Sequence, residues 1–288
     1  MHYLSFTTTG CWDQAEGFGC ASLGLPGLCD NFENRVRNYK SALESIMITG
    51  SYEDILFNAR EAVSQQDVYA AIVVFGNAGG ENTFLEALQK IVTCPMVGGG
   101  AAIDGATGRS GLIPGAGQAA VLLITDDRFT YEAKTECIHS DILEECTVKA
   151  SDPRTLLTIN GIAASQYLQN KKAELGLSQT DFEHLTLSDM RNVNAHLSCV
   201  DGVIKSGRDV TEKMLLRYVP QDAVYEKMYR FYNDPDAIVF GCAGLSGLLD
   251  RPLQTPSLGL FLFGEVCTVD GVAEFGNLML SKLVIRSK

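Results

Sequence analysis

Short apolar runs that stop at glycine recur along the chain, and segments with helical spacing separate them. Residues 70–75 and 237–240 are the clearest runs, and each leads into a glycine-rich turn. This pattern predicts buried strands that end in tight turns. Ser51 is a good N-cap for a segment whose apolar residues recur at every third or fourth position. Alternating strands and helices predict an α/β fold with mixed sheets.

The same patterns predict further elements. Residues 119–125, 156–159 and 278–285 have the composition of buried strands. Asp201-Gly202 lies between two apolar runs, which favours a two-residue hairpin turn. Helical spacing predicts helices over residues 35–46, from Ser51 onward, from Asn82 or Thr83 onward, over residues 163–175 and within residues 219–232.

A six-residue motif of the first half of the chain returns in the second half. Residues 74–79 (VFGNAG) match residues 239–244 (VFGCAG) at five of six positions. A Pro-x-x-Gly frame then follows in both halves, beginning at Pro95 and at Pro256. Two matches in the same order predict two related, and possibly duplicated, α/β lobes.

A polar turn at Ser151-Asp152-Pro153 is the predicted boundary between the lobes. The first lobe then covers residues 47–150 and the second covers residues 151–288. Residues 1–46 are rich in glycine, cysteine and aromatic side chains. We expect them to form an extension that packs on the first lobe.

The composition is that of a globular protein with an acidic balance. Hydrophobic residues make up 46% of the chain and charged residues 20%, as in ordinary folded domains. The net charge of −12, without a cluster of lysine or arginine, excludes nucleic acid and anionic membrane as favoured partners. No apolar segment is long enough to span a bilayer, and no signal peptide is recognisable at the start. We therefore expect a cytoplasmic protein without membrane insertion.

The cysteines do not indicate a disulfide framework or a metal site. Their number, nine, is odd, and the chain is large, which favours reduced thiols. Cys11, Cys20 and Cys29 recur at intervals of nine, which matches no common zinc-ligand spacing. Residues 115–120 (GAGQAA) fit a loose dinucleotide fingerprint but precede a predicted strand instead of following one. The sequence therefore predicts neither a metal nor a cofactor.

Cys242 and Glu265 are the candidate chemical groups. Cys242 follows a strand at the start of a possible helix, where the helix N-terminus would lower the thiol pKa. The alternative is a small buried residue, the commonest role of a free cysteine. Asn77 has the same place in the first motif and cannot act as a nucleophile, which favours a role in shape or hydrogen bonding. Glu265 ends another strand, where a buried carboxylate needs a partner such as Asn277 or a ligand.

The ordered set of motifs resembles the FIST sensory domain family over residues 47–285. The second half carries residues 159–169, residues 194–219, AIVFGCAG, LGLFLFGEV and Asn277 before the last strand. The first half carries ITGSYED from Ile48, AIVVFGNAGG and the glycine run after Pro95. In that family a Cys-x-Gly-Arg-Gly string commonly occupies residues 242–246. The arginine is missing here, which argues against an anion contact at that position.

The resemblance implies an intracellular sensory module that binds a small ligand such as an amino acid. Such modules are usually coupled to a kinase, a cyclase or a chemotaxis output. No output domain fits in this chain, so signalling would use a separate partner protein.

We therefore predict a non-enzymatic module that binds a small metabolite between its lobes. Strand-end glycines expose backbone N–H and C=O groups, which suit a zwitterion. A thiol-dependent enzyme using Cys242 and a protein-interaction scaffold are the alternatives. His139, His184 and His196 lie far apart in the sequence and indicate no catalytic set by their spacing. The predicted ligand-binding residues are Gly76, Asn77, Gly98, Gly99, Gly100, Gly241, Cys242, Gly264, Glu265 and Asn277.

Overall fold

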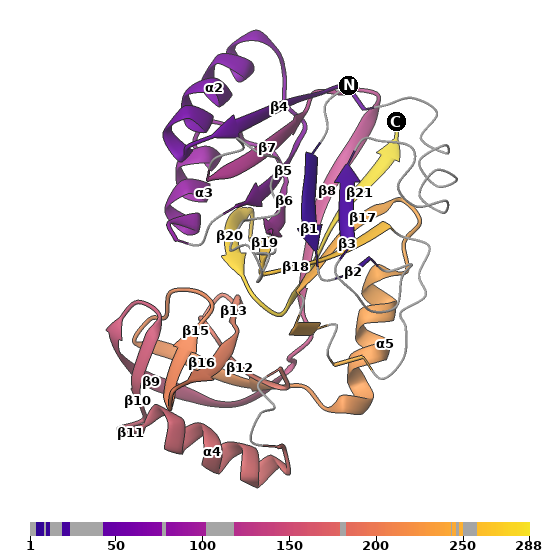
Figure 1. The fold of residues 1–288 in the computed structure, drawn as a ribbon. Coiled ribbons are helices and arrows are strands. Elements are labelled where there is room, and N and C mark those ends of the chain that lie inside the picture. Colours follow the sequence, from indigo (N-terminus) through magenta and orange to yellow (C-terminus); the bar gives the residue numbers. More distant parts are fainter. Residues whose placement is uncertain are drawn as a thin grey trace.

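The computed structural model confirms an α/β fold with mixed sheets (Figure 1). It describes residues 4–8, 10–11, 19–23, 43–76, 79–101, 118–178, 183–242, 244–245, 248–249 and 258–288. Two sheets form the upper body of the molecule in Figure 1, and a third sheet with its own helix lies below them.

The first sheet has the strand order β20-β19-β6-β5-β7-β4. Helices α2 (Tyr52–Gln65) and α3 (Glu81–Gln89) cover its outer face. Ser51 caps α2 in a reciprocal capping box with Asp54, so the helix predicted from Ser51 is confirmed. The strands are β4 (Ser45–Gly50), β5 (Ala70–Phe75), β6 (Met96–Gly100), β7 (Ala119–Ile124), β19 (Glu265–Val269) and β20 (Val272–Gly276).

The second sheet has the order β2-β18-β17-β21-β8, and helix α5 (Gln221–Tyr232) packs on its outer face. Its last strand by sequence, β21, is central, because it pairs with both β17 and β8. The strands are β2 (Gly10–Cys11), β8 (Phe129–Cys137), β17 (Ala237–Cys242), β18 (Leu258–Leu262) and β21 (Met279–Ser287).

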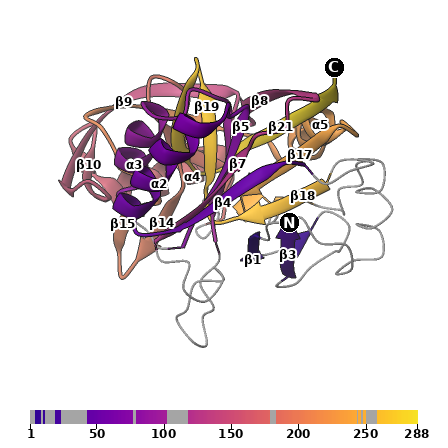
Figure 2. The same cartoon turned by 90° about the horizontal axis from the view of Figure 1, so that it is seen from above.

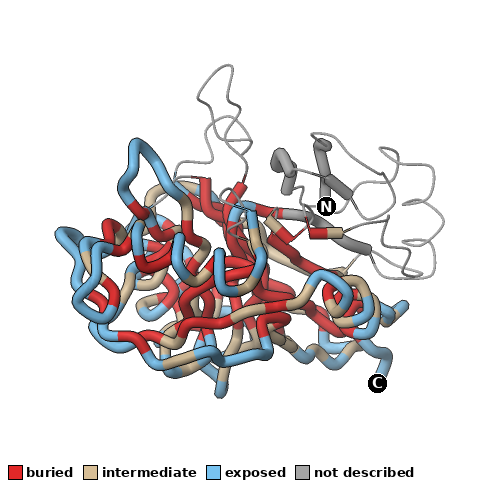
Figure 3. The backbone as a smooth tube through the Cα atoms, turned by 90° about the horizontal axis from the view of Figure 1, so that it is seen from below, coloured by how far each residue is buried: buried red, intermediate tan, exposed pale blue. Residues whose placement is uncertain are grey.

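The two sheets pack face to face. Ile72 and Val97 of the first sheet share one apolar cluster with Phe240, Leu262 and Leu283 of the second. Figure 2 shows α2 and α3 on one side of these sheets and α5 on the other. In Figure 3 the strands between these helices are predominantly buried. The body is therefore a helix–sheet–sheet–helix sandwich, with its main core between the sheets.

The two lobes share a local topology. In the first, β5 pairs with β6 in parallel and with β7 antiparallel. In the second, β17 pairs with β18 in parallel and with β21 antiparallel. The lobes also exchange strands, since β19 and β20 extend the first sheet and β8 extends the second.

The third sheet is formed by residues between β8 and α5. Its order is β13-β12-β16-β9-β10-β15-β14, with β11 paired to β10, and α4 (Ala164–Leu175) packs on it around a separate apolar cluster. The hairpin predicted at Asp201-Gly202 is confirmed, because Val200 pairs with Val203 and both turn residues have positive φ. The strands are β9 (Asp141–Asp152), β10 (Thr155–Ile159), β11 (Ile162–Ala163), β12 (Leu185–Ser188), β13 (Asn194–Ala195), β14 (Leu197–Val200), β15 (Val203–Ser206) and β16 (Lys213–Tyr218).

The structure differs from some of the sequence predictions. The boundary expected between residues 150 and 151 falls inside β9, whose pairing with β16 places it in the third sheet. We call the chain from 141 to 218 the inserted unit. The helix expected over residues 35–46 is wrong at its end, because Ser45 and Ile46 belong to β4, and residues 35–42 lie outside the described residues.

The described strands of the N-terminal region form two pairings. β1 (Leu4–Thr8) pairs with β3 (Gly19–Leu23), and β2 pairs with β18. We expected this extension on the first lobe, but β2 adds a strand to the second sheet.

Candidate functional site

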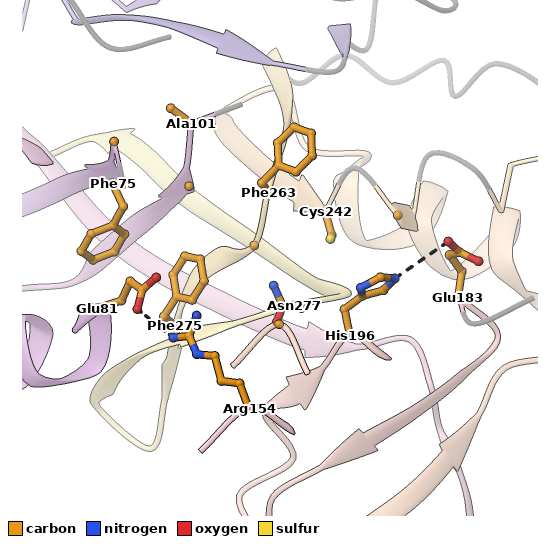
Figure 4. Close-up of a pocket in the computed structure, with 15 residues that line it drawn as sticks. Phe75, Glu81, Ala101, Arg154, Glu183, His196, Cys242, Phe263, Phe275 and Asn277 are labelled. Atoms are coloured by element: carbon orange, nitrogen blue, oxygen red, sulfur yellow. Dashed lines mark hydrogen bonds and ion pairs between the residues drawn. The ribbon is translucent and has the colours of Figure 1, made fainter. Parts of the chain in front are cut away.

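The ends of the parallel strands in both lobes meet the inserted unit around a pocket of about 460 Å³ (Figure 4). That volume lies in the range of about 300–1,000 Å³ common for small-molecule sites. The body supplies Phe75, Gly76, Glu81, Gly100, Ala101, Cys242, Gly244, Phe263, Gly264, Phe275 and Asn277, and the inserted unit supplies Arg154, Glu183, His196 and Gly207.

Half of the predicted ligand-binding residues line this pocket. They are Gly76, Gly100, Cys242, Gly264 and Asn277. The pocket lining does not include Gly98, Gly99, Gly241 or Glu265. Asn77 lies outside the described residues.

Backbone packing accounts for the first two residues of the glycine run. A β-carbon on Gly98 would lie 1.8 Å from the carbonyl oxygen of Val73, and φ at Gly98 is +139°. A β-carbon on Gly99 would lie 2.2 Å from the carbonyl oxygen of Gly264. These glycines let β6 approach β5 and the turn between β18 and β19, so their presence needs no ligand.

Cys242, which lines the pocket, and Glu265, which does not, form a buried pair. Glu265 is 0% exposed, and one of its oxygens accepts a hydrogen bond from the Met279 N–H at 3.4 Å. Burial raises the pKa of the Glu265 carboxyl well above its ordinary value of 4.5, although the Met279 N–H and the Cys242 thiol favour the charged form. Glu265 Oε1 has no hydrogen-bond partner among the described residues.

Burial also governs the thiol of Cys242. Burial, and to a lesser extent the neighbouring Glu265, raise the pKa of this thiol to about 12. The backbone N–H groups of Leu278, Gly244 and Gly264 oppose that rise by favouring the thiolate. The pKa is therefore the reverse of the lowered value that the sequence suggested for a reactive thiol at a helix start.

Asn277 places an amide in the pocket between Phe275 and His196 (Figure 4). The residue is only 7% exposed, and its Oδ1 has no hydrogen-bond partner among the described residues. Its backbone N–H donates to the carbonyl oxygen of Asn194 at 3.0 Å, which ties the body to the inserted unit. A buried acceptor without a partner is costly, so this amide is a strong candidate for ligand contact.

An ion pair joins the inserted unit to the first lobe on one wall of the pocket. Arg154 follows β9 and contacts Glu81 and Asp209, each at 2.9 Å. Glu81 is 3% exposed, lies at the N-terminus of α3, and also accepts a hydrogen bond from the Gly79 N–H at 2.8 Å. The buried carboxylate is thus compensated by a cation and by the helix N-terminus.

The polar side chains of His196 and Glu183 lie close together on the opposite wall of the pocket. His196 Nε2 lies 3.9 Å from Glu183 Oε1. Glu183 is held by His139, whose Nε2 lies 2.6 Å from the Glu183 carbonyl oxygen, and whose Nδ1 lies 3.2 Å from Asn194 Nδ2. Burial lowers the pKa of His139 to about 4, so this ring is neutral and serves as a fixed support.

The sequence did not single out Glu81, Arg154, Glu183 or His196 as site residues. Three of them come from the inserted unit, for which the repeat gives no counterpart. The best available signal was the segment 194–196, which contains β13 and lies in one of the motifs that carried the sequence resemblance. Their convergence depends on how the third sheet meets the body.

The described part of the chain shows no cluster of three His, Cys, Asp or Glu side chains that could hold a metal ion. Among its helices, none is long and apolar enough to cross a membrane.

The pocket can therefore offer a small molecule an apolar body site and polar ends. Phe75, Phe263 and Phe275 provide aromatic surface, and Asn277 provides an amide. The walls carry groups of both charge signs.

In comparisons with known proteins, no protein-family model and no curated protein matches this sequence.

Proposed function

We propose that the chain is a sensory module that binds a small zwitterionic metabolite, such as an amino acid, in this pocket. The observation that carries the proposal is the Asn277 amide, which is nearly buried, lines the pocket and has an oxygen without a partner among the described residues. A ligand ammonium or hydroxyl could donate to that oxygen. The resemblance to the FIST sensory domains leads to the same class of ligand.

The charged walls favour a ligand that carries both signs. Arg154 can attract a ligand carboxylate, and Glu183 can attract an ammonium. The aromatic side chains between them suit an apolar side chain.

The pocket joins the body to the inserted unit, so a bound ligand would contact both. We propose that this contact draws the two parts together, and that a separate cytoplasmic partner protein reads the closed form. A ligand can shift this equilibrium only through its greater affinity for one of the two forms.

Thermal-shift measurements with a panel of amino acids test the proposal. At least one amino acid should raise the melting temperature, and the analogues that lack its ammonium or its carboxylate should do so less. The Asn277→Ala variant should lose most of the shift, whereas Lys90→Ala, which changes the exposed C-cap of α3 outside the pocket lining, should keep it. Equal responses from the wild type and Asn277→Ala, or no response to any metabolite, would refute the proposal.

A further inference from the structure

Three side chains of the pocket are of the types that serve as a nucleophile, a base and an orienting acid. Cys242 comes from the end of β17, His196 lies between β13 and β14, and Glu183 precedes β12. In Figure 4 the His196 ring lies between Cys242 and Glu183. A catalytic set is recognised by such convergence in space and by the role of each group.

Short distances place these groups in one small region of the pocket. A β-carbon placed on Gly244 would lie 3.8 Å from Cys242 Sγ and 3.6 Å from Glu183 Cγ. His196 Nε2 lies 3.9 Å from Glu183 Oε1. Glu183 and Cys242 therefore border the same space beside Gly244. The imidazole has a carboxylate beside its Nε2, so the other ring nitrogen, Nδ1, would take the thiol proton.

Two sets of donors could stabilise charge that develops on reaction. The backbone N–H groups of Gly244, Gly264 and Leu278 lie against Cys242 Sγ and favour its thiolate. The Asn277 amide lines the same pocket and is held between the backbones of Gly207 and Gly264, where added β-carbons would lie 2.4 Å from its Oδ1 and 2.7 Å from its Nδ2. An asparagine amide in this setting can donate to an oxyanion.

The resting thiol is protonated, so the set needs a base. Burial and the neighbouring Glu265 raise the pKa of the Cys242 thiol to about 12, and burial raises the pKa of the Glu265 carboxyl well above 4.5. The nucleophile would be activated by an adjacent general base, as a serine hydroxyl is.

We propose that Cys242, His196 and Glu183 cleave a small ester or thioester in this pocket. The proposal rests on the proposed function in one respect, because both require a small molecule to enter the same site. The pocket of about 460 Å³, with Phe75, Phe263 and Phe275 on its walls, restricts the substrate to a short acyl group with an apolar body. A purely sensory function would give no role to a thiol and an imidazole in the same pocket.

The reaction balances without an oxidant or a metal. His196 takes the thiol proton, Sγ attacks the carbonyl carbon, an S–C bond forms and the carbonyl electron pair moves to the oxygen beside Asn277. The intermediate then collapses, the bond to the alkoxide or thiolate leaving group breaks, and His196 returns the proton to that group. Water attacks the resulting acyl-thioester, the S–C bond breaks, and the carboxylic acid leaves as the thiol regains a proton.

Hydrolysis of p-nitrophenyl acetate, followed with intact-protein mass spectrometry, tests this proposal. The wild type should gain the mass of one acetyl group, located on Cys242 by peptide mapping, and should turn the ester over. Cys242→Ala should lose both signals, whereas Cys199→Ala, which removes an exposed thiol of β14, should keep them. His196→Gln should lower kcat by about 10²–10⁴-fold. Asn277→Ala should lower kcat by about 10²–10³-fold.

Melting curves separate catalysis from a structural effect. His196→Gln should keep the wild-type melting temperature while the acetylation of Cys242 slows. Acetylation of Cys199 in place of Cys242, or unchanged turnover by Cys242→Ala, would overturn the proposal. Amino-acid stabilisation of Cys242→Ala reports the proposed binding function separately, so either proposal can fail without the other.

Discussion

The two lobes contain the same Val-Phe-Gly motif but turn it toward different layers. Val74 of β5 packs between the two sheets, whereas Val239 of β17 packs against α5. Phe75 packs under α2 and α3, whereas Phe240 lies between the sheets. Because side chains alternate along a strand, the two motifs differ in phase by an odd number of residues relative to the sandwich. A shared motif and a shared topology therefore do not make the aligned residues equivalent in space.

That difference corrects one inference from the sequence. Asn77 and Cys242 occupy the same place in the aligned motifs, and this favoured a non-covalent role for Cys242. The opposite orientation of the preceding residues removes the basis for the comparison. Cys242 must instead be judged by its own surroundings, which are Glu265, three backbone N–H groups and the pocket.

Substitution of the two motif phenylalanines is the most direct way to break the comparison. Phe240→Ala should lower the free energy of unfolding by about 3–5 kcal/mol, because it leaves a cavity in the closed layer between the sheets. Phe75→Ala should cost less, since its ring borders the pocket and water can enter the space. Urea denaturation measures both. Equal losses would show that the two positions are equivalent after all.

The glycine run of the first lobe gives the next largest expected effect. Gly98→Ala should lower the free energy of unfolding by about 3 kcal/mol, because the new β-carbon meets the Val73 carbonyl and the backbone φ is unfavourable. The control is Gly271→Ala, where φ is +75° but no atom lies within 4 Å, so only the strain of about 1 kcal/mol applies. Similar losses for both variants would mean that β6 can move away from β5.

The buried carboxylates of Glu81 and Glu265 differ in how they should make the stability of the protein depend on pH. Glu81 of the first lobe is paired with Arg154, whereas Glu265 has no salt bridge within the described residues. Because the folded-state pKa of Glu265 is raised, the folded protein retains a proton that the unfolded chain releases above pH 4.5. The stabilisation that this retained proton provides is complete below that pH. It is lost as pH rises toward the folded-state pKa, and the free energy of unfolding then falls by at most about 1.4 kcal/mol per pH unit.

Glu265→Gln should remove this dependence. Relative to the wild type, the variant should become progressively more stable from pH 5 to pH 8 in denaturant titrations. A constant difference between the two proteins over this range would show that Glu265 is charged in the folded state.

Local sequence patterns predicted much of the fold. The Ser51 capping box, the Asp201-Gly202 turn and the apolar run of β5 each depend on residues close together in sequence, and each was predictable. The helix expected up to Ile46 failed because the pairing of β4 with β7 joins distant segments and overrides local spacing.

The site was only half predictable for a related reason. Glycine and cysteine at strand ends are visible in the sequence, so Gly76, Gly100 and Cys242 were found. Arg154 and His196 reach the pocket only because the inserted unit folds back onto the body. No spacing rule relates residues that meet through the contact of two separately formed cores.

The exchange of strands between the lobes has a consequence for folding. β8 pairs along its whole length with β21, although the inserted unit and α5 lie between them in the sequence. A chain that lacks β19 to β21 leaves β8 with an uncovered edge and β6 without β19, and such edges recruit other chains. Because these contacts join segments far apart in the sequence, folding should be slow. A chain cut before β19 is therefore expected to aggregate instead of yielding a working first half.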